Sequence, residues 1–238
     1  MLRHQGNART MLHNLRLASL LSFVAGMVNV AGFISINRLT TNVTGHFAYL
    51  IYEVFELSWD KAGIFLLYIF FFFLGSFISN FLITFYHKRA AGYAYAIPVA
   101  VESSILISLG LGGEFLTLNY SNHLACMLLL AMGMQNALVT SISNATVRTT
   151  HLTGLFTDLG IELSQLCFKP NTQQKHRLTS SIKLRLTIIL FFFLGGIFGG
   201  LTYYSLKLKC LIVTGFILLA GLSFDYFKYY ILTRKRAK

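Results

Sequence analysis

Two sets of residues suited to binding follow the same order in the two halves of the chain. Thr44 and Gly45 correspond to Thr153 and Gly154, within the motifs Thr40-Thr41-Asn42-Val43-Thr44-Gly45 and Thr149-Thr150-His151-Leu152-Thr153-Gly154. Threonine is a good helix N-cap and glycine permits close backbone approach, so each motif predicts a helix start. The free N–H groups of a helix start suit a polar or anionic solute. The alternative is a capped loop at a membrane surface.

Side-chain amides precede both motifs inside apolar segments. Asn29 ends the run Gly26-Met27-Val28-Asn29, and Asn136 ends the similar run Gly133-Met134-Gln135-Asn136. Polar groups at membrane depth usually face the interior of a helix bundle and find partners there. They therefore serve either hydrogen bonds between helices or solute contacts. The predicted substrate-binding set is Asn29, Thr44, Gly45, Gln135, Asn136, Thr150, Thr153 and Gly154.

Four carboxylates are candidates for coupling solute movement to an ion: Glu53, Glu102, Asp158 and Glu162. Glu53 and Glu162 follow the two motifs at equal distances, and Asp158 shares a helical face with Glu162 because it lies four residues earlier. Their alternative role is ion pairing with Lys61 or Arg148. Glu102 lies inside an apolar run, where a carboxyl group is protonated or paired.

The chain has none of the short motifs typical of nucleotide-driven pumps, serine hydrolases or zinc peptidases. His46 and His151 flank the threonine motifs, but no Cys, His or carboxylate cluster with ligand spacing accompanies them. We therefore predict no metal site, no cofactor and no assigned catalytic residue.

Apolar helices must position all of these residues. The chain has 238 residues, of which 55% are hydrophobic and 12% charged, and such a composition excludes a disordered chain and argues against a soluble domain. Uncharged apolar runs of bilayer-spanning length occur at 17–37, 62–86, 93–111, within 115–147, at 186–206 and at 208–230. We expect an all-α integral membrane protein with six transmembrane helices, multi-pass in the cell membrane.

The net charge of +12 is a signal of topology. If the N-terminus is cytoplasmic, only Arg38, Lys61, Lys207 and Lys209 among the 20 Lys and Arg residues lie on the outer side. The positive-inside rule then predicts that both termini are cytoplasmic. Nucleic acid is not an expected partner.

The two halves predict a repeat with inverted orientation. Phe71-Phe72-Phe73-Leu74-Gly75 recurs as Phe191-Phe192-Phe193-Leu194-Gly195, and three spans per half turn the second half upside down. This 3+3 inverted repeat is common among transporters. Gly26, Gly133 and Gly195 are expected at close helix contacts.

The expected units are a basic N-terminus (1–16), two three-helix repeats (17–113 and 114–230) and a basic tail (231–238). The second repeat includes a solvated cytoplasmic loop at about 169–185. The segments 46–57 and 155–168 are candidate re-entrant half-helices.

The run Met132-Gly133-Met134-Gln135-Asn136-Ala137, followed by the second threonine motif, resembles the YoaK family of bacterial multi-pass membrane proteins without an assigned activity. The resemblance extends over about 17–226. The first half departs from the family pattern, with Asn29 in place of Asp and His46 in place of Asn. The resemblance implies a fold group and a membrane location, and it leaves the substrate open.

The function that these features favour is a secondary transporter or channel for a small polar solute, with a midplane site between the two repeats. One alternative is an intramembrane enzyme that acts on a lipid through Glu102, Asp158, Glu162 and His151. Another is a non-catalytic membrane scaffold. The expected partners are the lipid bilayer and a small-molecule solute, and a homo-oligomer is left open.

Overall fold

The computed structural model describes residues 10–90, 93–143, 145–168 and 170–236, with side chains described except at 88–90 and 225–236. All regular elements in these ranges are helical, which confirms the predicted all-α class. In chain order they are α1 (Met11–Ile36), α2 (Thr44–Phe55), α3 (Trp59–Ala90), α4 (Ala96–Asn119), α5 (Ser121–Ser143), α6 (Leu152–Cys167), α7 (Thr172–Leu206), η2 (Lys207–Lys209) and α8 (Cys210–Arg236).

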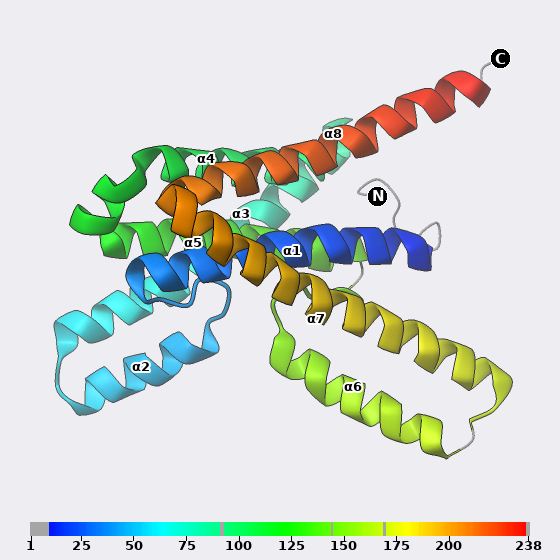
Figure 1. Ribbon diagram of the computed structural model, residues 1–238, viewed down its shortest axis with the longest axis horizontal. Coiled ribbons are helices and arrows are strands. Elements are labelled where there is room, and N and C mark those ends of the chain that lie inside the picture. Colours follow the sequence, from blue (N-terminus) through cyan, green and yellow to red (C-terminus); the bar gives the residue numbers. More distant parts are fainter. Residues whose placement is uncertain (1–9, 91–92, 144, 169, 237–238) are drawn as a thin grey trace.

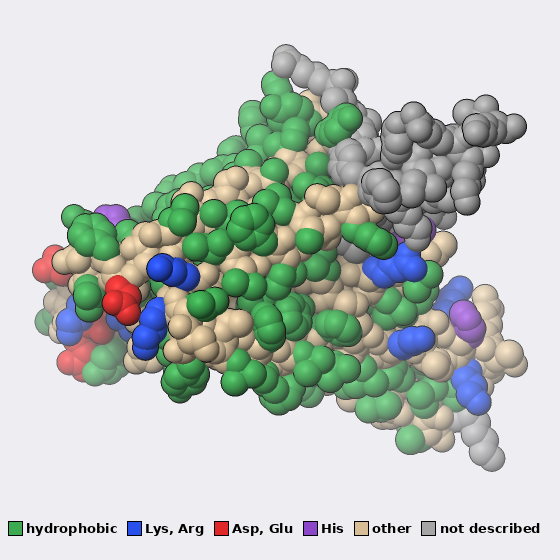
Figure 2. Space-filling view, turned by 45° about the horizontal axis from the view of Figure 1, so that its top comes forward, with side chains coloured by type: hydrophobic (Ala, Val, Ile, Leu, Met, Phe, Trp, Pro, Cys, Tyr) green, Lys and Arg blue, Asp and Glu red, His purple; other side chains and the backbone are tan. Residues whose placement is uncertain are grey.

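Five helical stretches in the described residues are long and apolar enough to cross a membrane: Met11–Ile36, Trp59–His87, Ala96–Asn119, Ser121–Ser143 and Thr172–Phe224. The last stretch of 53 residues runs through α7 and η2 into α8, so it contains the predicted span at 186–206 and the predicted span at 208–230 as far as Phe224. Figure 2 shows apolar side chains over the middle of the molecule and charged side chains at the two ends of its long axis. The chain is therefore a helical protein of membrane type.

The main helix contacts join the two halves of the chain. α1 packs along α7, α3 along α5, and α4 along α8 (Figure 1). In the aligned halves, α1 corresponds to α5, α3 to α7 and α4 to α8. The α1–α7 contact therefore has the α5–α3 contact as its counterpart, and the α4–α8 contact joins two equivalent helices. The helices thus interlock across the halves.

Glycines permit backbone contact where α1 crosses α7. A Cβ atom on Gly26 would overlap the carbonyl oxygen of Phe192, and one on Gly195 would overlap the carbonyl oxygen of Phe23. Helices in a membrane gain stability from such close approach because dispersion contacts replace the hydrophobic drive available in water. The prediction that Gly26 and Gly195 mark helix contacts is confirmed.

The α3–α5 crossing repeats this arrangement at the corresponding positions. A Cβ atom on Gly133 would overlap the carbonyl oxygen of Phe72, and one on Gly75 would overlap the carbonyl oxygen of Leu130. Gly133 and Gly75 are the counterparts of Gly26 and Gly195 in the repeated motifs. Both crossings therefore depend on the same pair of reciprocal glycine contacts.

Two short helices follow breaks in the chain after α1 and α5. α2 packs against α3, and α6 packs against α7. Figure 1 shows both short helices beginning near the middle of the long axis and running outward toward opposite ends. The predicted apolar segments 46–57 and 155–168 thus correspond to α2 and α6.

The prediction of a loop at about 169–185 is wrong, because α7 begins at Thr172. The Asn171 side chain accepts a hydrogen bond from the Gln174 N–H (2.8 Å), and the Gln174 side chain accepts one from the Asn171 N–H (3.3 Å). This capping box starts a helix despite the polar composition. Ile182 and Leu184 are buried, so the segment is an amphipathic helix. Lys169, at the start of the predicted loop, lies outside the described residues.

Candidate functional site

In each break, a threonine side chain forms a hydrogen bond with an asparagine of the preceding helix. The Thr41 hydroxyl donates to Oδ1 of Asn29 (2.9 Å), and the Thr150 hydroxyl donates to Oδ1 of Asn136 (2.8 Å). The predicted pair of asparagines thus occupies equivalent sites, and each is bonded within its own half. Thr41 was missing from the predicted set, although its match with Thr150 in the repeated motif was the signal for it.

The threonines expected to cap the short helices lie one or two residues inside them. α2 begins at Thr44 after Val43, and α6 begins at Leu152 after His151. Neither Val43 nor His151 makes a side-chain capping bond. The interpretation of Thr44 and Thr153 as N-caps is therefore wrong, because both lie in the first helical turn and are exposed.

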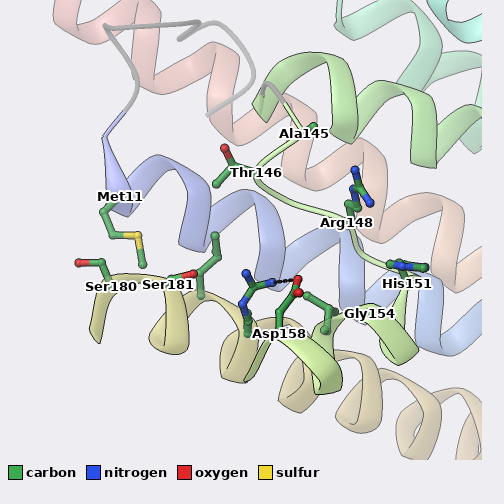
Figure 3. A pocket seen from close by; sticks show the side chains of 12 residues that line it. Met11, Ala145, Thr146, Arg148, His151, Gly154, Asp158, Ser180 and Ser181 are labelled. Atoms are coloured by element: carbon green, nitrogen blue, oxygen red, sulfur yellow. Dashed lines mark ion pairs between the residues drawn. The ribbon is translucent and has the colours of Figure 1, made fainter. Parts of the chain in front are cut away.

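A cavity of about 540 Å³ lies at the start of α6, between the second break, α7 and the first residue of α1 (Figure 3). Its volume is in the range of small-molecule sites. Of the predicted residues it includes Gly154 and Asp158. The lining consists of Met11, Ala145, Thr146, Arg148, His151, Gly154, Leu155, Asp158, Ser180, Ser181, Leu184 and Arg185.

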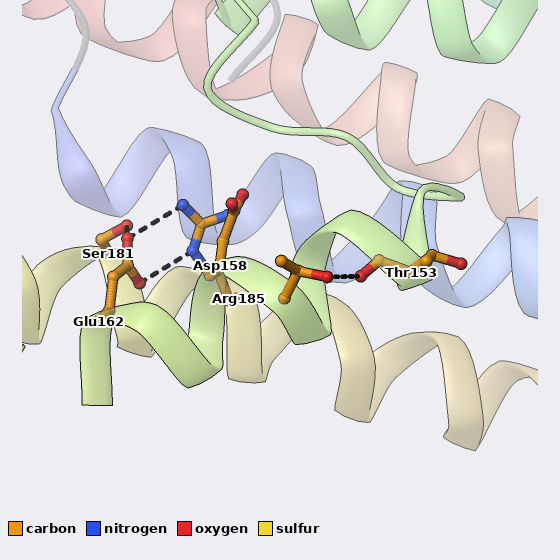
Figure 4. A network of polar contacts seen from close by, with 6 residues as sticks. Thr153, Asp158, Glu162, Ser181 and Arg185 are labelled. Carbon is orange, nitrogen blue, oxygen red and sulfur yellow. Dashed lines mark hydrogen bonds and ion pairs between the residues drawn. The ribbon is translucent and has the colours of Figure 1, made fainter. Parts of the chain in front are cut away.

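A network of charges joins α6 to α7 along one wall of this cavity (Figure 4). Nε and a terminal nitrogen of Arg185 contact the two carboxyl oxygens of Glu162 at 2.9 and 3.0 Å, and its other terminal nitrogen lies 2.8 Å from Asp158. The Ser181 hydroxyl also donates to Glu162 (2.6 Å). The guanidinium group thus bridges both predicted carboxylates.

The network holds the pKa of Glu162 below its ordinary value. Burial by itself raises the pKa of this carboxyl, but the hydrogen bonds from Arg185 and Ser181 and the positive charge of Arg185 outweigh it. Glu162 is therefore an ionised carboxylate at neutral pH. The sequence interpretation missed Arg185 and Ser181 because both fell in the predicted loop. Their spacing of four residues, equal to that of Asp158 and Glu162, was the available signal.

At the first break, aromatic side chains occupy the corresponding space. The Tyr49 and Phe65 rings stack at 5.1 Å between centroids, and the buried His46 ring contacts Tyr68 at 5.2 Å. Nε2 of His46 lies 2.7 Å from the carbonyl oxygen of Leu39. Burial lowers the pKa of His46, which favours the neutral imidazole. The guanidinium group of Arg38 lies over the Phe65 ring, 5.5 Å from its centroid, so neutral rings and one cation meet at this end.

The other predicted residues lie apart from the cavity lining. The Gln135 side chain is buried and donates to the carbonyl oxygen of Leu21 (2.9 Å), which joins α5 to α1. Glu53 lies 4.0 Å from Lys61, the partner considered in its structural alternative. Gly45 donates its N–H to Asn42 (3.4 Å). Glu102 is buried in α4, and neither of its carboxyl oxygens has a hydrogen-bond partner in the described part of the chain.

Comparison with known proteins gives a family without a function. A family model described as "Protein of unknown function (DUF1275)" matches residues 17–223. Neither the curated proteins nor the solved structures contain a match. The geometry of the second break is therefore the main guide to function.

Proposed function

This chain belongs to the DUF1275 family of proteins of unknown function, and we propose that it is a secondary transporter whose small polar solute enters through the cavity at the start of α6. The proposal includes six spans arranged as a 3+3 inverted repeat, with α2 and α6 as re-entrant half-helices. It places the chain in the cell membrane with both termini in the cytoplasm, and assigns it to the YoaK group within the family.

The inverted repeat is supported by the way that the helices pair. The α1–α7 and α5–α3 crossings use reciprocal glycine contacts at matching positions, and the two Thr–Asn bonds also match. Two half-helices that begin near the middle of a bundle and point outward to opposite ends are typical of inverted-repeat transporters. α1 begins and α8 ends toward the same end of the molecule, as the proposed topology requires (Figure 1).

The observation that carries the transport proposal is a difference between equivalent positions at the two ends. When the repeated motifs are aligned, Tyr49 and Phe65 correspond to Asp158 and Arg185. The first pair is an aromatic stack of Tyr49 on the buried Phe65, and the second is an ion pair on the wall of an open cavity. A transporter with alternating access has one closed end and one open end at a time. In this proposal the described conformation is open toward α6 and α7.

The alternatives gain less from the structure. A channel needs a path open at both ends, and the aromatic packing at the first break opposes one. A non-catalytic scaffold does not account for the cavity, because a scaffold needs no space of solute size. For a lipid-modifying enzyme, both carboxyl oxygens of Glu162 are bonded to Arg185, so neither is free to act as an acid or base. We assign Glu102 as the residue that couples transport to protons, because it is buried within α4 and apart from these ion pairs.

Covalent blocking of the cavity tests the transport proposal. Cys126 and Cys210 are buried, so Cys167→Ser removes the exposed thiol and provides a background for labelling. In this background we expect Ser180→Cys, on the cavity wall, to lose most solute flux after reaction with a bulky methanethiosulfonate reagent. The measurement is uptake of a radiolabelled panel of amino acids, sugars, carboxylates and amines by proteoliposomes.

Lys183→Cys is the matched control, because this exposed residue lies on the same helix outside the cavity lining. Its modification is expected to leave flux unchanged. Absence of flux for the entire panel, with protein that remains monodisperse and folded, would contradict transport.

A further inference from the structure

The cavity at the start of α6 presents two regions of opposite charge. Arg148, on the break between α5 and α6, makes no ion pair with a carboxylate within the part of the chain that the structure describes. On the α6–α7 wall, Arg185 is bound by both Asp158 and Glu162, so that group of three carries one positive and two negative charges. Figure 3 shows Arg148 on the break, apart from the ion pair of Asp158.

The surroundings of Arg148 are suited to a carboxylate. Gly154, in the first turn of α6, lines the cavity, and the N-cap residue of this helix makes no side-chain capping bond. The Thr146 hydroxyl is a further donor in the lining. A guanidinium group with additional N–H and O–H donors is the usual arrangement for binding a carboxylate.

The opposite wall is suited to an ammonium group. The Asp158 side chain is 50% exposed, so it has oxygen lone pairs that remain accessible beside its bond to Arg185. The excess negative charge of the Asp158–Glu162–Arg185 group attracts a cation to this wall. Leu155 and Leu184 add buried apolar surface to the lining between the polar groups.

We propose, on the basis of the transport function, that this cavity binds a small zwitterion, with its carboxylate at Arg148 and the first turn of α6 and its ammonium at Asp158. Free amino acids carry both groups, and the buried Leu155 and Leu184 in the lining suit an aliphatic side chain. A simple anion would leave the excess negative charge at Asp158 and Glu162 unpaired. A simple amine would leave Arg148 unpaired. A solute with both charges can pair with Arg148 and with Asp158 at the same time, whereas each simple ion pairs with only one of them.

The test uses three compounds with one carbon skeleton: L-leucine, 4-methylpentanoate, which lacks the amine, and 3-methylbutylamine, which lacks the carboxylate. We expect the purified protein in detergent to bind leucine at least 10-fold more tightly than either of the others, as measured by isothermal calorimetry. In the Arg148→Gln variant the advantage of leucine over 3-methylbutylamine is expected to disappear. In the Asp158→Asn variant its advantage over 4-methylpentanoate is expected to disappear, while the bonds from Arg185 to Glu162 preserve the α6–α7 contact.

Lys183→Gln removes an exposed positive charge from α7 outside the cavity and is the matched control, with unchanged leucine binding expected. Equal binding of leucine and 4-methylpentanoate, or no leucine binding by folded protein, would overturn the zwitterion proposal. If another solute class is then transported and the Ser180→Cys block stops it, the transport function stands without this ligand. If no solute is transported, the transport function itself fails.

Discussion

Gly133→Val is expected to abolish the folded protein. Any side chain at this position would overlap the backbone of Phe72, and the backbone of α3 cannot rotate away as a flexible side chain could. Overpacking in cores usually costs about 1–3 kcal/mol, and we expect the upper end of this range or more because two helix backbones must separate. The measurement is the size-exclusion profile and thermal unfolding of the purified protein in detergent.

Gly63→Val is the matched control for this prediction. Gly63 also lies in a long helix, α3, but a Cβ atom there would meet nothing within 4 Å. Valine is no worse a helix former than glycine, so the control should be neutral or slightly stabilising. Gly26→Val, at the equivalent crossing of α1 with α7, should be as damaging as Gly133→Val. A stable, monodisperse Gly133→Val protein would show that the α3–α5 crossing is wrongly described.

Arg185→Gln is expected to destabilise the α6–α7 contact and to reduce transport at least tenfold. The change leaves the charges of Asp158 and Glu162 without the guanidinium group that neutralises both. Hydrogen bonds to charged groups contribute about 1.5–3 kcal/mol, and partial solvent exposure of Asp158 favours the lower end of that range. Thermal unfolding and proteoliposome flux measure the two effects. Lys183→Gln is the matched control, with little change in either.

The same network predicts the direction of the pH dependence. The pKa of Glu162 is lowered in the folded protein from its ordinary value of 4.5, so its contribution to stability is complete above that value. It is lost as the pH falls through the lower pKa of the folded state. The stability difference between the wild-type protein and Arg185→Gln should therefore be constant near neutral pH and shrink in acid below about pH 4.5. A difference that grows in acid would contradict this assignment of the network.

The positions of the long helices could be predicted because each depends on local composition. Uncharged apolar runs located α3 to within four residues at each end and α1 to within six, and α5 lies inside its longer run. The repeated glycines identified the places where helices make close contact. Both features can be recognised without knowledge of the partner helix. The pairing itself, α1 with α7 and α3 with α5, could not be derived from either half alone.

The polar part of the candidate site was harder to predict for a physical reason. Arg185 becomes a site residue only because α7 begins at Thr172 and aligns its polar face with Asp158 and Glu162 on α6. A segment rich in Gln, Thr and Lys has the composition of a loop, and the capping residue Asn171 was the local evidence against that interpretation. The role of Arg148 likewise depends on a cavity formed by distant segments.

An inverted repeat places equivalent positions of the two halves on opposite faces of the membrane, and labelling from the two sides of a sealed membrane distinguishes it from a parallel repeat. Asp60 and Ser180 are equivalent positions of α3 and α7 in the aligned repeats. The measurement is the side from which an impermeant thiol reagent reaches Asp60→Cys and Ser180→Cys in the Cys167→Ser background. We expect labelling of Asp60→Cys from the outer face only and of Ser180→Cys from the cytoplasmic face only. Labelling of both positions from the same face would contradict the inverted repeat.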